Sequence, residues 1–238
     1  MWSLIIPIYN INEDLVELTK NAIGSIKGCD EFILIDNAST CKQDYPEATT
    51  VIRNKQNKGY PAAVNQGAKK ATGEYFAIAN NDIRVSQNWK SVAQEIFAED
   101  EKIGSVHFRM IGYDDPMALG QTTWVTGRER WCSASFFVIR KEAFVGYDEG
   151  YGLGGYDDWD FFYRLRGAGW KTAYTNRACY QHKHSSTQLA LDQVERFERD
   201  MRSKERFRKK FGGYAEELFA LEYPEQMGEN YYEFLNTI

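Results

Sequence analysis

The sequence predicts an α/β fold, in which a mixed sheet is flanked by helices and followed by a C-terminal helical extension. Apolar runs of strand length alternate with amphipathic segments of helix length, several runs end in polar clusters, and a long charged segment follows them. Alternating strands and helices form βαβ units, which build a largely parallel sheet.

The first four apolar runs are predicted to be strands whose carboxyl ends lie together. They cover residues 3–8, 31–35, 50–53 and 74–79, and the clusters that follow them are Tyr9-Asn10, Asp36-Asn37, Asn54-Lys55 and Asn80-Asn81-Asp82. Ligands of an open parallel sheet bind beyond the carboxyl ends of its strands. These clusters therefore predict a nucleotide-sized site at one edge of the sheet.

The remaining elements follow from periodicity and from turn residues. Helices are predicted at 14–26, 61–70, 88–98, 161–168 and 189–211, a short helix at 141–144, and further strands at 131–139, 171–174 and 178–180. Residues 111–130 have little periodicity, and we expect an edge hairpin or a loop over the site there. The long last helix should end at Gly212-Gly213.

The composition fits one large α/β domain with a tail, since 238 residues with 43% hydrophobic side chains can bury a substantial core. A net charge of −5 argues against nucleic acid as a partner. The four cysteines form no CxxC pair, and no apolar stretch reaches the ~20 residues of a spanning helix. The first strand begins at once, without a signal peptide, so we expect a soluble cytoplasmic protein.

Two clusters are candidates for binding a cation. Asn80 and Asp82 place their oxygens on the same side of an extended chain, where they could face a cation or a ribose. His182 follows a short strand, and an imidazole completes an oxygen-rich shell that suits manganese. The alternatives are an Asx turn that closes the strand and an ordinary solvent-facing histidine.

The neighbouring polar clusters are candidates for binding a nucleotide. Asp36 and Asn37 could accept hydrogen bonds from a pyrimidine or a ribose, or Asp36 could cap a turn. Asn57, Gly59 and Asn65 surround a helix start, which favours anionic groups but is also a common turn.

The acidic cluster Asp157-Asp158-Trp159-Asp160 is the candidate for acid–base chemistry. Close like charges raise the pKa of at least one carboxyl group, which prepares a general base. Asp160 could instead cap the following helix. Trp131, Tyr156 and Trp159 suit stacking on a sugar, although aromatic residues are also common in cores.

The helix predicted at 189–211 carries many basic residues. Acidic residues three or four positions away favour a solvated face with i,i+4 ion pairs. The alternative is a face that contacts a membrane surface or a partner.

In order along the chain, these motifs resemble those of the family-2 glycosyltransferases, which have the GT-A fold, a Rossmann-like mixed sheet. The resemblance covers residues 3–187 and rests on Ile6-Pro7-Ile8-Tyr9-Asn10, Leu34-Ile35-Asp36-Asn37-Ala38-Ser39, Asn57-Lys58-Gly59 with Asn65-Gln66-Gly67, Asn80-Asn81-Asp82, Asp157-Asp158-Trp159-Asp160-Phe161 with Arg164, and His182. It implies a GT-A domain at 1–187, with a nucleotide-binding half at 1–110 and an acceptor half at 111–187. Residues 188–238 form the C-terminal helical extension.

The resemblance also implies roles for individual residues. The nucleotide-sugar would contact Pro7, Tyr9, Asn10, Asp36, Asn37, Asn57, Gly59, Asn65, Asn80 and Asn81. Asp82 and His182 would hold Mn²⁺ or Mg²⁺, with Asn80 in place of the first aspartate of the family's DXD element. Asp158 would be the catalytic base, with Asp157 in the place of the glutamate before it. Trp131 and Trp159 would contact the acceptor.

The implied activity is the metal-dependent transfer of a sugar, with inversion, from a nucleoside-diphosphate sugar to a hydroxyl group. The favoured donors are UDP- or dTDP-sugars, and the acceptor would be a glycan, a lipid-linked molecule or a polymer. The protein would work in the cytoplasm or at the inner face of the membrane, with the basic helix 189–211 as the contact. Two alternatives stay open. A nucleotidyltransferase usually carries a glycine-rich basic loop after the first strand, which Pro7-Ile8-Tyr9-Asn10 is not. A non-catalytic nucleotide-sugar-binding protein would have the same fold.

Overall fold

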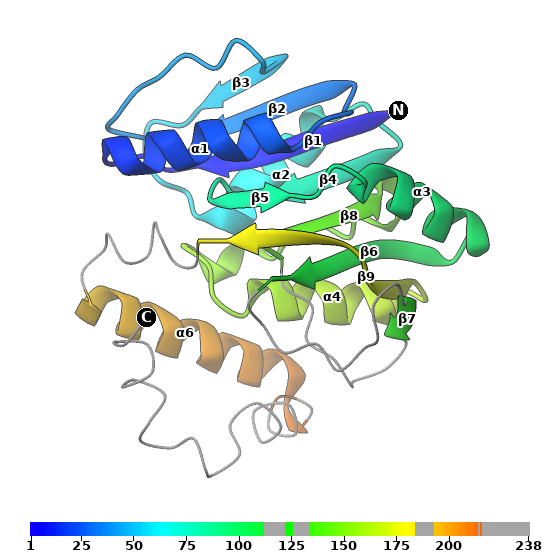
Figure 1. Cartoon of the computed structure of the whole chain (residues 1–238). Helices are drawn as coiled ribbons and strands as arrows, with labels where there is room; N and C mark the ends of the chain where they lie inside the picture. The colour runs from blue at the N-terminus through cyan, green and yellow to red at the C-terminus, as the bar shows by residue number, and fades with distance from the viewer. Residues whose placement is uncertain (112–121, 126–133, 184–192, 214, 216–238) are drawn as a thin grey trace.

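The computed structural model describes residues 1–111, 122–125, 134–183, 193–213 and 215 (Figure 1). The strands are β1 (Trp2–Ile8), β2 (Glu31–Asp36), β3 (Thr50–Arg53), β4 (Tyr75–Ala79), β5 (Ile83–Val85), β6 (Ile103–Met110), β7 (Thr122–Val125), β8 (Phe136–Arg140) and β9 (Lys171–His182). The helices are α1 (Glu13–Ser25), α2 (Tyr60–Lys70), α3 (Trp89–Glu99), α4 (Asp157–Gly167) and α6 (Gln193–Phe211), with 3₁₀ turns η1 (Lys141–Ala143) and η2 (Glu149–Tyr151).

Within the described residues, nine strands form one mixed sheet. Its order is β3-β2-β1-β4-β8-β6-β9-β5, and β7 pairs with β9 outside this path. The neighbours β3, β2, β1 and β4 run parallel, as do β6 and β9, whereas β8 is antiparallel to both β4 and β6. The arrowheads of β3, β6 and β9 point to the same, left-hand side of Figure 1. The carboxyl ends of the parallel strands therefore share one edge.

Helices cover both faces of the sheet because side chains alternate along each strand. Leu4 and Ile6 belong to the hydrophobic cluster that includes residues of α1 and α3. Ile5 belongs to the opposite cluster, with residues of α2 and α4. Burial on both faces explains why β1 is almost continuously apolar, as is usual for parallel strands. The mixed sheet between two helical layers confirms the predicted fold class.

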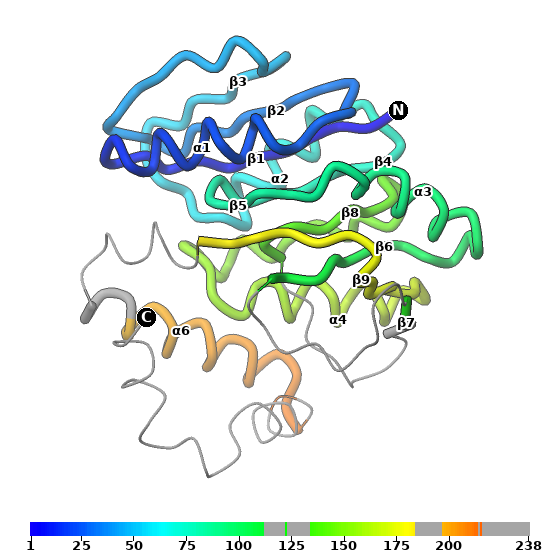
Figure 2. Tube along the Cα trace, in the orientation of Figure 1, coloured from blue at the N-terminus to red at the C-terminus, as the bar shows by residue number. Residues whose placement is uncertain are grey.

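Helix α6 packs away from the sheet, near α4 (Figure 2). Phe207 on α6 is fully buried in a third cluster with Tyr151 and Trp159. The part of the predicted helix before Gln193 lies outside the described residues.

Several predicted boundaries were wrong. Lys171–His182 is one strand, although two short strands were predicted, and neither β5 nor β6 was predicted as a strand. Helix α4 begins at Asp157, so Asp160 lies inside its first turn and Tyr156 is the N-cap. Asp160 therefore does not cap the helix, and we assign it a different role below. Of the segment predicted as a hairpin or loop, residues 112–121 and 126–130 lie outside the described residues.

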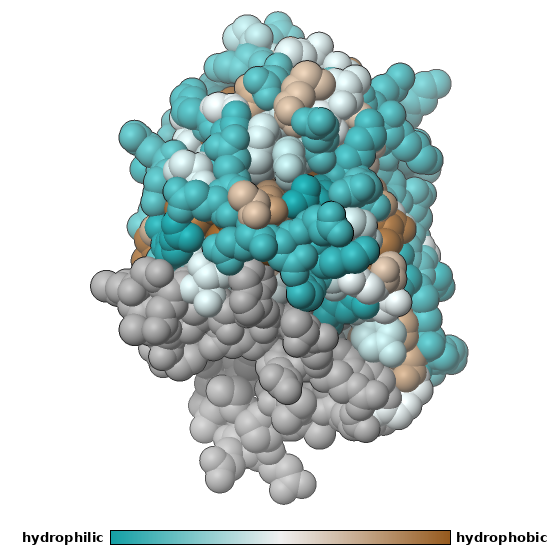
Figure 3. Space-filling view, turned by 90° about the vertical axis from the view of Figure 1, so that its right-hand side faces the viewer, coloured by the Kyte–Doolittle hydropathy of each residue, from teal (hydrophilic) through white to brown (hydrophobic). Residues whose placement is uncertain are grey.

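On the side of the molecule away from the carboxyl ends of the strands, the residues that are coloured in the space-filling view are largely hydrophilic (Figure 3). Among the coloured residues of that view, the hydrophobic ones are scattered over the surface. No described helix combines the length and the apolar character needed to cross a bilayer.

Candidate active site

Asp82 and His182, the predicted metal ligands, lie side by side. The distance from Asp82 Oδ1 to His182 Nε2 is 3.0 Å, and both side chains are less than a tenth exposed. The register of β5 and β9 produces this contact, because Ile83 pairs with His182 and Asp82 immediately precedes Ile83. The Nδ2 atom of Asn80 lies 3.4 Å from the same imidazole nitrogen. The structure therefore brings the three predicted side chains together at the end of β4.

Ser135 completes this group, and no motif in the sequence pointed to it. Its Oγ lies 3.2 Å from His182 Nδ1, and its backbone carbonyl accepts a hydrogen bond of 2.8 Å from the backbone N–H of Asn80. Because β8 is antiparallel to β4, the start of β8 meets the carboxyl end of β4. A serine hydroxyl can donate or accept, so Ser135 can hold either tautomer of His182.

The donor set fits a divalent cation. A carboxylate oxygen, an amide oxygen and an imidazole are ligands that manganese accepts, and diphosphate oxygens or water commonly complete such shells. Asp82, Asn80 and His182 can supply them from one corner. The described residues contain no group of three or more His, Cys, Asp or Glu side chains arranged for a metal. A metal held by Asp82, Asn80 and His182, the Asp82–His182 corner, would need further ligands from a bound molecule or from water.

Asn10 and Asn81, predicted to contact the nucleotide-sugar, use their side chains within the protein. Asn81 Nδ2 donates to Asn10 Oδ1 at 3.1 Å and to Thr19 Oγ1 at 3.0 Å, and Asn10 Nδ2 donates to Tyr45 Oη at 2.8 Å. Both asparagines are buried. This network fixes the ends of β1 and β4 against α1. Pro7 and Tyr9, by contrast, are partly exposed at the end of β1.

Asp36, at the end of β2, closes a turn. Its Oδ1 accepts from the Ser39 amide at 2.8 Å, and its Oδ2 pairs with Arg53 Nη1 at 2.7 Å. The sequence left open whether Asp36 binds a ligand or caps a turn, and the structure contains the turn. Its contact with a nucleotide stays a prediction.

Asn37 shapes the loop that leads into α2. It donates to Asn57 Oδ1 at 2.7 Å and to the Gly59 carbonyl at 3.2 Å, and it accepts from the Lys58 amide at 3.0 Å. Gly59 has φ +86, and a Cβ there would lie 1.7 Å from the Gly152 carbonyl oxygen. This loop therefore touches the glycine-rich segment that precedes Asp157.

Asn65 holds the same segment from the first turns of α2. Its Oδ1 accepts from the Tyr147 amide at 2.8 Å, and its Nδ2 donates to the Tyr147 carbonyl at 2.9 Å and to Glu149 Oε1 at 2.9 Å. Asn65 thus links α2 to the segment that leads to the acidic residues. Whether it also contacts a donor sugar stays a prediction.

Asp157 and Asp158 lie in the first turn of α4, and we call residues 148–158, which are these two residues and the segment that leads to them, the acidic loop. Asp157 is buried, and its Oδ1 accepts from the Gly155 amide at 2.6 Å. Burial raises the pKa of Asp157 to about 6, with Asp160 adding to the rise while hydrogen bonds from backbone amides and the charge of Arg199 oppose it. The predicted rise in pKa is therefore present, and burial contributes more to it than the neighbouring carboxylate does.

Asp158 is the more accessible carboxylate of the pair. Its side chain is partly exposed, and its Oδ1 accepts from the Trp159 amide at 2.9 Å. Burial, followed by the charges of Asp157 and Asp158, raises the pKa of Tyr60 well above its usual range. Tyr60 Oη also donates to the Ala134 carbonyl at 3.2 Å, next to Ser135. Tyr60 and the start of β8 thus connect the acidic loop with the Asp82–His182 corner.

Of the two tryptophans predicted to contact the acceptor, only Trp159 lies within the described residues. Trp159 is 9% exposed, and its ring packs edge-on against Phe207, at 5.9 Å between centroids, and against Tyr156, at 5.4 Å. Trp159 is therefore part of the contact with α6, and its role toward an acceptor stays a prediction. Trp131 lies outside the described residues.

The fold is that of the GT-A glycosyltransferases, and solved structures of that class superpose on it. TarS 1-349 from S. aureus has a TM-score of 0.60 at 14% identity, over 89% of this chain and 72% of that one. GalNAc-T7, solved with UDP, GalNAc and Mn²⁺, has a TM-score of 0.61 at 16% identity, over 76% of this chain and 43% of that one. The chain belongs to glycosyl transferase family 2, whose model matches residues 3–151.

Curated relatives agree with the family. Glycosyltransferase GlyG of Streptococcus pneumoniae is 26% identical over 172 residues, which cover 60% of this chain and 57% of that protein. Dolichol-phosphate mannosyltransferase of Pyrococcus furiosus is 32% identical over 92 residues, which cover 34% of this chain and 26% of that protein. The aligned region thus spans little more than half the length of the first relative and about a quarter of the second.

Proposed function

We propose that the protein transfers a sugar from a nucleoside-diphosphate sugar to an acceptor hydroxyl, with inversion at the anomeric carbon. The contact between Asp82 and His182 carries the proposal, because it places a carboxylate and an imidazole beside Asn80 where the parallel strands end. The family match and the UDP-GlcNAc complex of the structural neighbour TarS support a UDP-sugar, with a dTDP-sugar as the second choice.

In the proposed reaction, the carboxylate of Asp158 accepts the proton of the acceptor hydroxyl while the oxygen of that hydroxyl attacks the anomeric carbon. The bond between that carbon and the diphosphate oxygen breaks, and the nucleoside diphosphate leaves with the electron pair. A cation held by Asp82 and His182, Mn²⁺ or Mg²⁺, would supply Lewis-acid stabilisation of the leaving group. Asp157, which is buried and bonded to Gly155, would keep the loop that carries Asp158 in shape.

The acceptor is proposed to be a glycan, a lipid-linked glycan or a polymer. Membrane contact through α6 would require its basic side chains to face outward. Arg202, Arg206, Lys209 and Lys210 are all exposed, but Arg206 and Lys210 also pair with Asp148 of the same chain. A location at the inner membrane face would therefore rest on the outward-facing cations alone.

The decisive experiment separates donor binding from transfer. Wild type should be stabilised against heat by one of a panel of UDP- and dTDP-sugars with Mn²⁺, because a ligand that binds the folded state raises its melting temperature. Asp158→Asn should keep that shift and lose transfer by at least about 10²-fold, the lower range for a general base. Asp82→Ala should lose the Mn²⁺-dependent part of the shift.

Two results would reject the proposal. Transfer by Asp158→Asn within tenfold of wild type would remove the base assignment. Full activity in excess chelator would show that transfer does not depend on a metal. Binding without transfer to any tested acceptor would instead favour a non-catalytic nucleotide-sugar-binding protein.

A further inference from the structure

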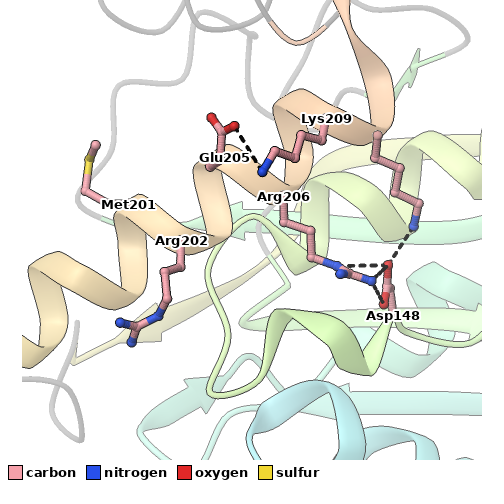
Figure 4. Close-up of a pocket in the computed structure, with 7 residues that line it drawn as sticks. Asp148, Met201, Arg202, Glu205, Arg206 and Lys209 are labelled. Atoms are coloured by element: carbon pink, nitrogen blue, oxygen red, sulfur yellow. Dashed lines mark hydrogen bonds and ion pairs between the residues drawn. The ribbon is translucent and has the colours of Figure 1, made fainter.

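Helix α6 directs two cations toward Asp148, the first residue of the acidic loop. Arg206 Nη2 lies 2.8 Å from Asp148 Oδ1 (Figure 4). Lys210 Nζ lies 2.8 Å from Asp148 Oδ2. Burial acts to raise the pKa of Asp148, but hydrogen bonds from Lys210, the Gly150 amide and Arg206 lower it to about 2. Asp148 is therefore an anion joined to α6 at neutral pH.

Lys210 also reaches a second carboxylate, just beyond the end of the loop. Its Nζ lies 2.5 Å from Oδ2 of Asp160, which is fully buried. Asp160 pairs with Arg164 and accepts from Tyr151 Oη at 3.2 Å as well. Removing Lys210 would leave the buried Asp160 carboxylate with Arg164 and Tyr151 and with one cation fewer, which is unfavourable because water cannot reach it. A single ammonium group thus links residues on both sides of the catalytic pair.

Further contacts from α6 lie between these two ends. Ser203 Oγ is buried and donates to the Gly154 carbonyl at 3.0 Å. Phe207 packs against the rings of Tyr156 and Trp159. A Cβ on Gly150 would lie 2.2 Å from the guanidinium of Arg206, so that side chain lies directly on the loop backbone.

The backbone of the acidic loop needs such support. Gly152, Gly154 and Gly155 all have positive φ, and Tyr156 has φ 57 although it is not glycine. Glycines leave a chain many alternative conformations, and a left-handed non-glycine residue persists only when its surroundings hold it. On the other side, the Asn65–Tyr147 and Gly59–Gly152 contacts connect the loop to the nucleotide-binding half.

On the basis of the proposed function, we propose that Lys210 is a positioning residue, which fixes the acidic loop so that Asp158 faces the acceptor. Arg206 and Ser203 assist it. The Asp82–His182 corner lies where β4, β5 and β9 end or begin, with Ser135 beside it, whereas the contacts of Lys210 described above are with Asp148 and Asp160. Lys210 should therefore act on the transfer step and leave donor binding unchanged.

The test compares two neighbouring lysines. Lys210→Met removes the clamp, and Lys209→Met removes the same charge one residue away. Lys209 is 75% exposed and pairs at 3.5 Å with Glu205 of its own helix (Figure 4). The third variant, Lys210→Arg, keeps a cation within reach of both carboxylates.

We expect Lys210→Met to lower kcat by about 10²-fold, the loss that a 1 Å misplacement can cause. Its affinity for UDP-GlcNAc with Mn²⁺, measured by calorimetry, should stay within about twofold. Lys210→Arg should recover most of the activity, and Lys209→Met should match wild type. Amide hydrogen exchange of residues 150–158 should become faster in Lys210→Met alone.

The inference is overturned if Lys210→Met has the same kcat as Lys209→Met and the same rate of amide hydrogen exchange in residues 150–158. It is also overturned if donor affinity, melting temperature and kcat fall together, since that pattern describes general loss of structure. If wild type transfers no sugar from any UDP- or dTDP-sugar, the proposed function fails, and the exchange measurement still decides whether Lys210 holds the loop.

Discussion

The substitution Asp157→Asn should stabilise the protein at neutral pH. The carboxyl group of Asp157 is buried, and burial raises its pKa from 3.8 to about 6. An asparagine keeps an oxygen that can accept from the Gly155 amide, and it has no proton to lose. The substitution therefore removes the unfavourable ionisation while leaving the hydrogen bond of the loop.

The size and the sign of the effect follow from linkage. The folded state holds the proton of Asp157 more tightly than the unfolded state does, so this contribution to stability is complete below pH 3.8 and is lost as the pH rises through about 6. The difference between 3.8 and about 6 corresponds to about 3 kcal/mol. The advantage of Asp157→Asn over wild type should therefore grow from near zero at low pH toward this value above pH 6.

Urea unfolding of both proteins at a series of pH values between about 4 and 7.5 measures the difference directly, because other titrating groups are common to both. Asp158→Asn controls for the loss of one negative charge in the first turn of α4. A stability difference between Asp157→Asn and wild type that does not change with pH would refute the reasoning, as would a difference that shrinks as the pH rises.

Two further predictions concern the site and the loop beside it. Ser135→Ala should weaken Mn²⁺ binding by about 10- to 100-fold, as is typical when the partner of a ligating histidine is lost. Titration of the metal-free protein with Mn²⁺ measures this loss of affinity. An unchanged Mn²⁺ affinity would contradict the role of Ser135 in orienting His182. Gly59→Ala should destabilise by more than about 1 kcal/mol in urea, because of its φ of +86 and the Gly152 carbonyl 1.7 Å from the new Cβ. Gly24→Ala is the matched control. Apart from its chain neighbours and the nearby backbone of α1, no atom lies within 4 Å of the added Cβ, so the substitution should stabilise α1 by about 0.5 to 1 kcal/mol.

The sequence was sufficient to predict the strands that build one edge of the site. Each of β1 to β4 is an apolar run followed by polar residues, and parallel strands bring such ends together whatever their order in the sheet. The family motifs also singled out Asp82 and His182, whose side chains lie 3.0 Å apart in the structure, and their role as metal ligands stays a prediction. These signals are local in the chain, so periodicity and motif order are enough to find them.

The partners of these residues could be found only in three dimensions. Ser135 contacts His182 because β8 runs antiparallel to β4, and strand direction cannot be read from an apolar run. Lys210 is one of many basic residues on α6, yet its contacts are with Asp148 and Asp160, far away in the sequence. Helical spacing describes only the charges on the same helix.

The asparagines at the strand ends illustrate the same division. Sequence alone was enough to predict that Asn10, Asn37 and Asn81 would lie just beyond the carboxyl ends of strands. Tertiary structure decided that the side chains of Asn10 and Asn81 bond to each other, and that Asn37 bonds to the loop before α2. Buried amides must find hydrogen-bond partners, and which partners they find depends on the packing of distant segments.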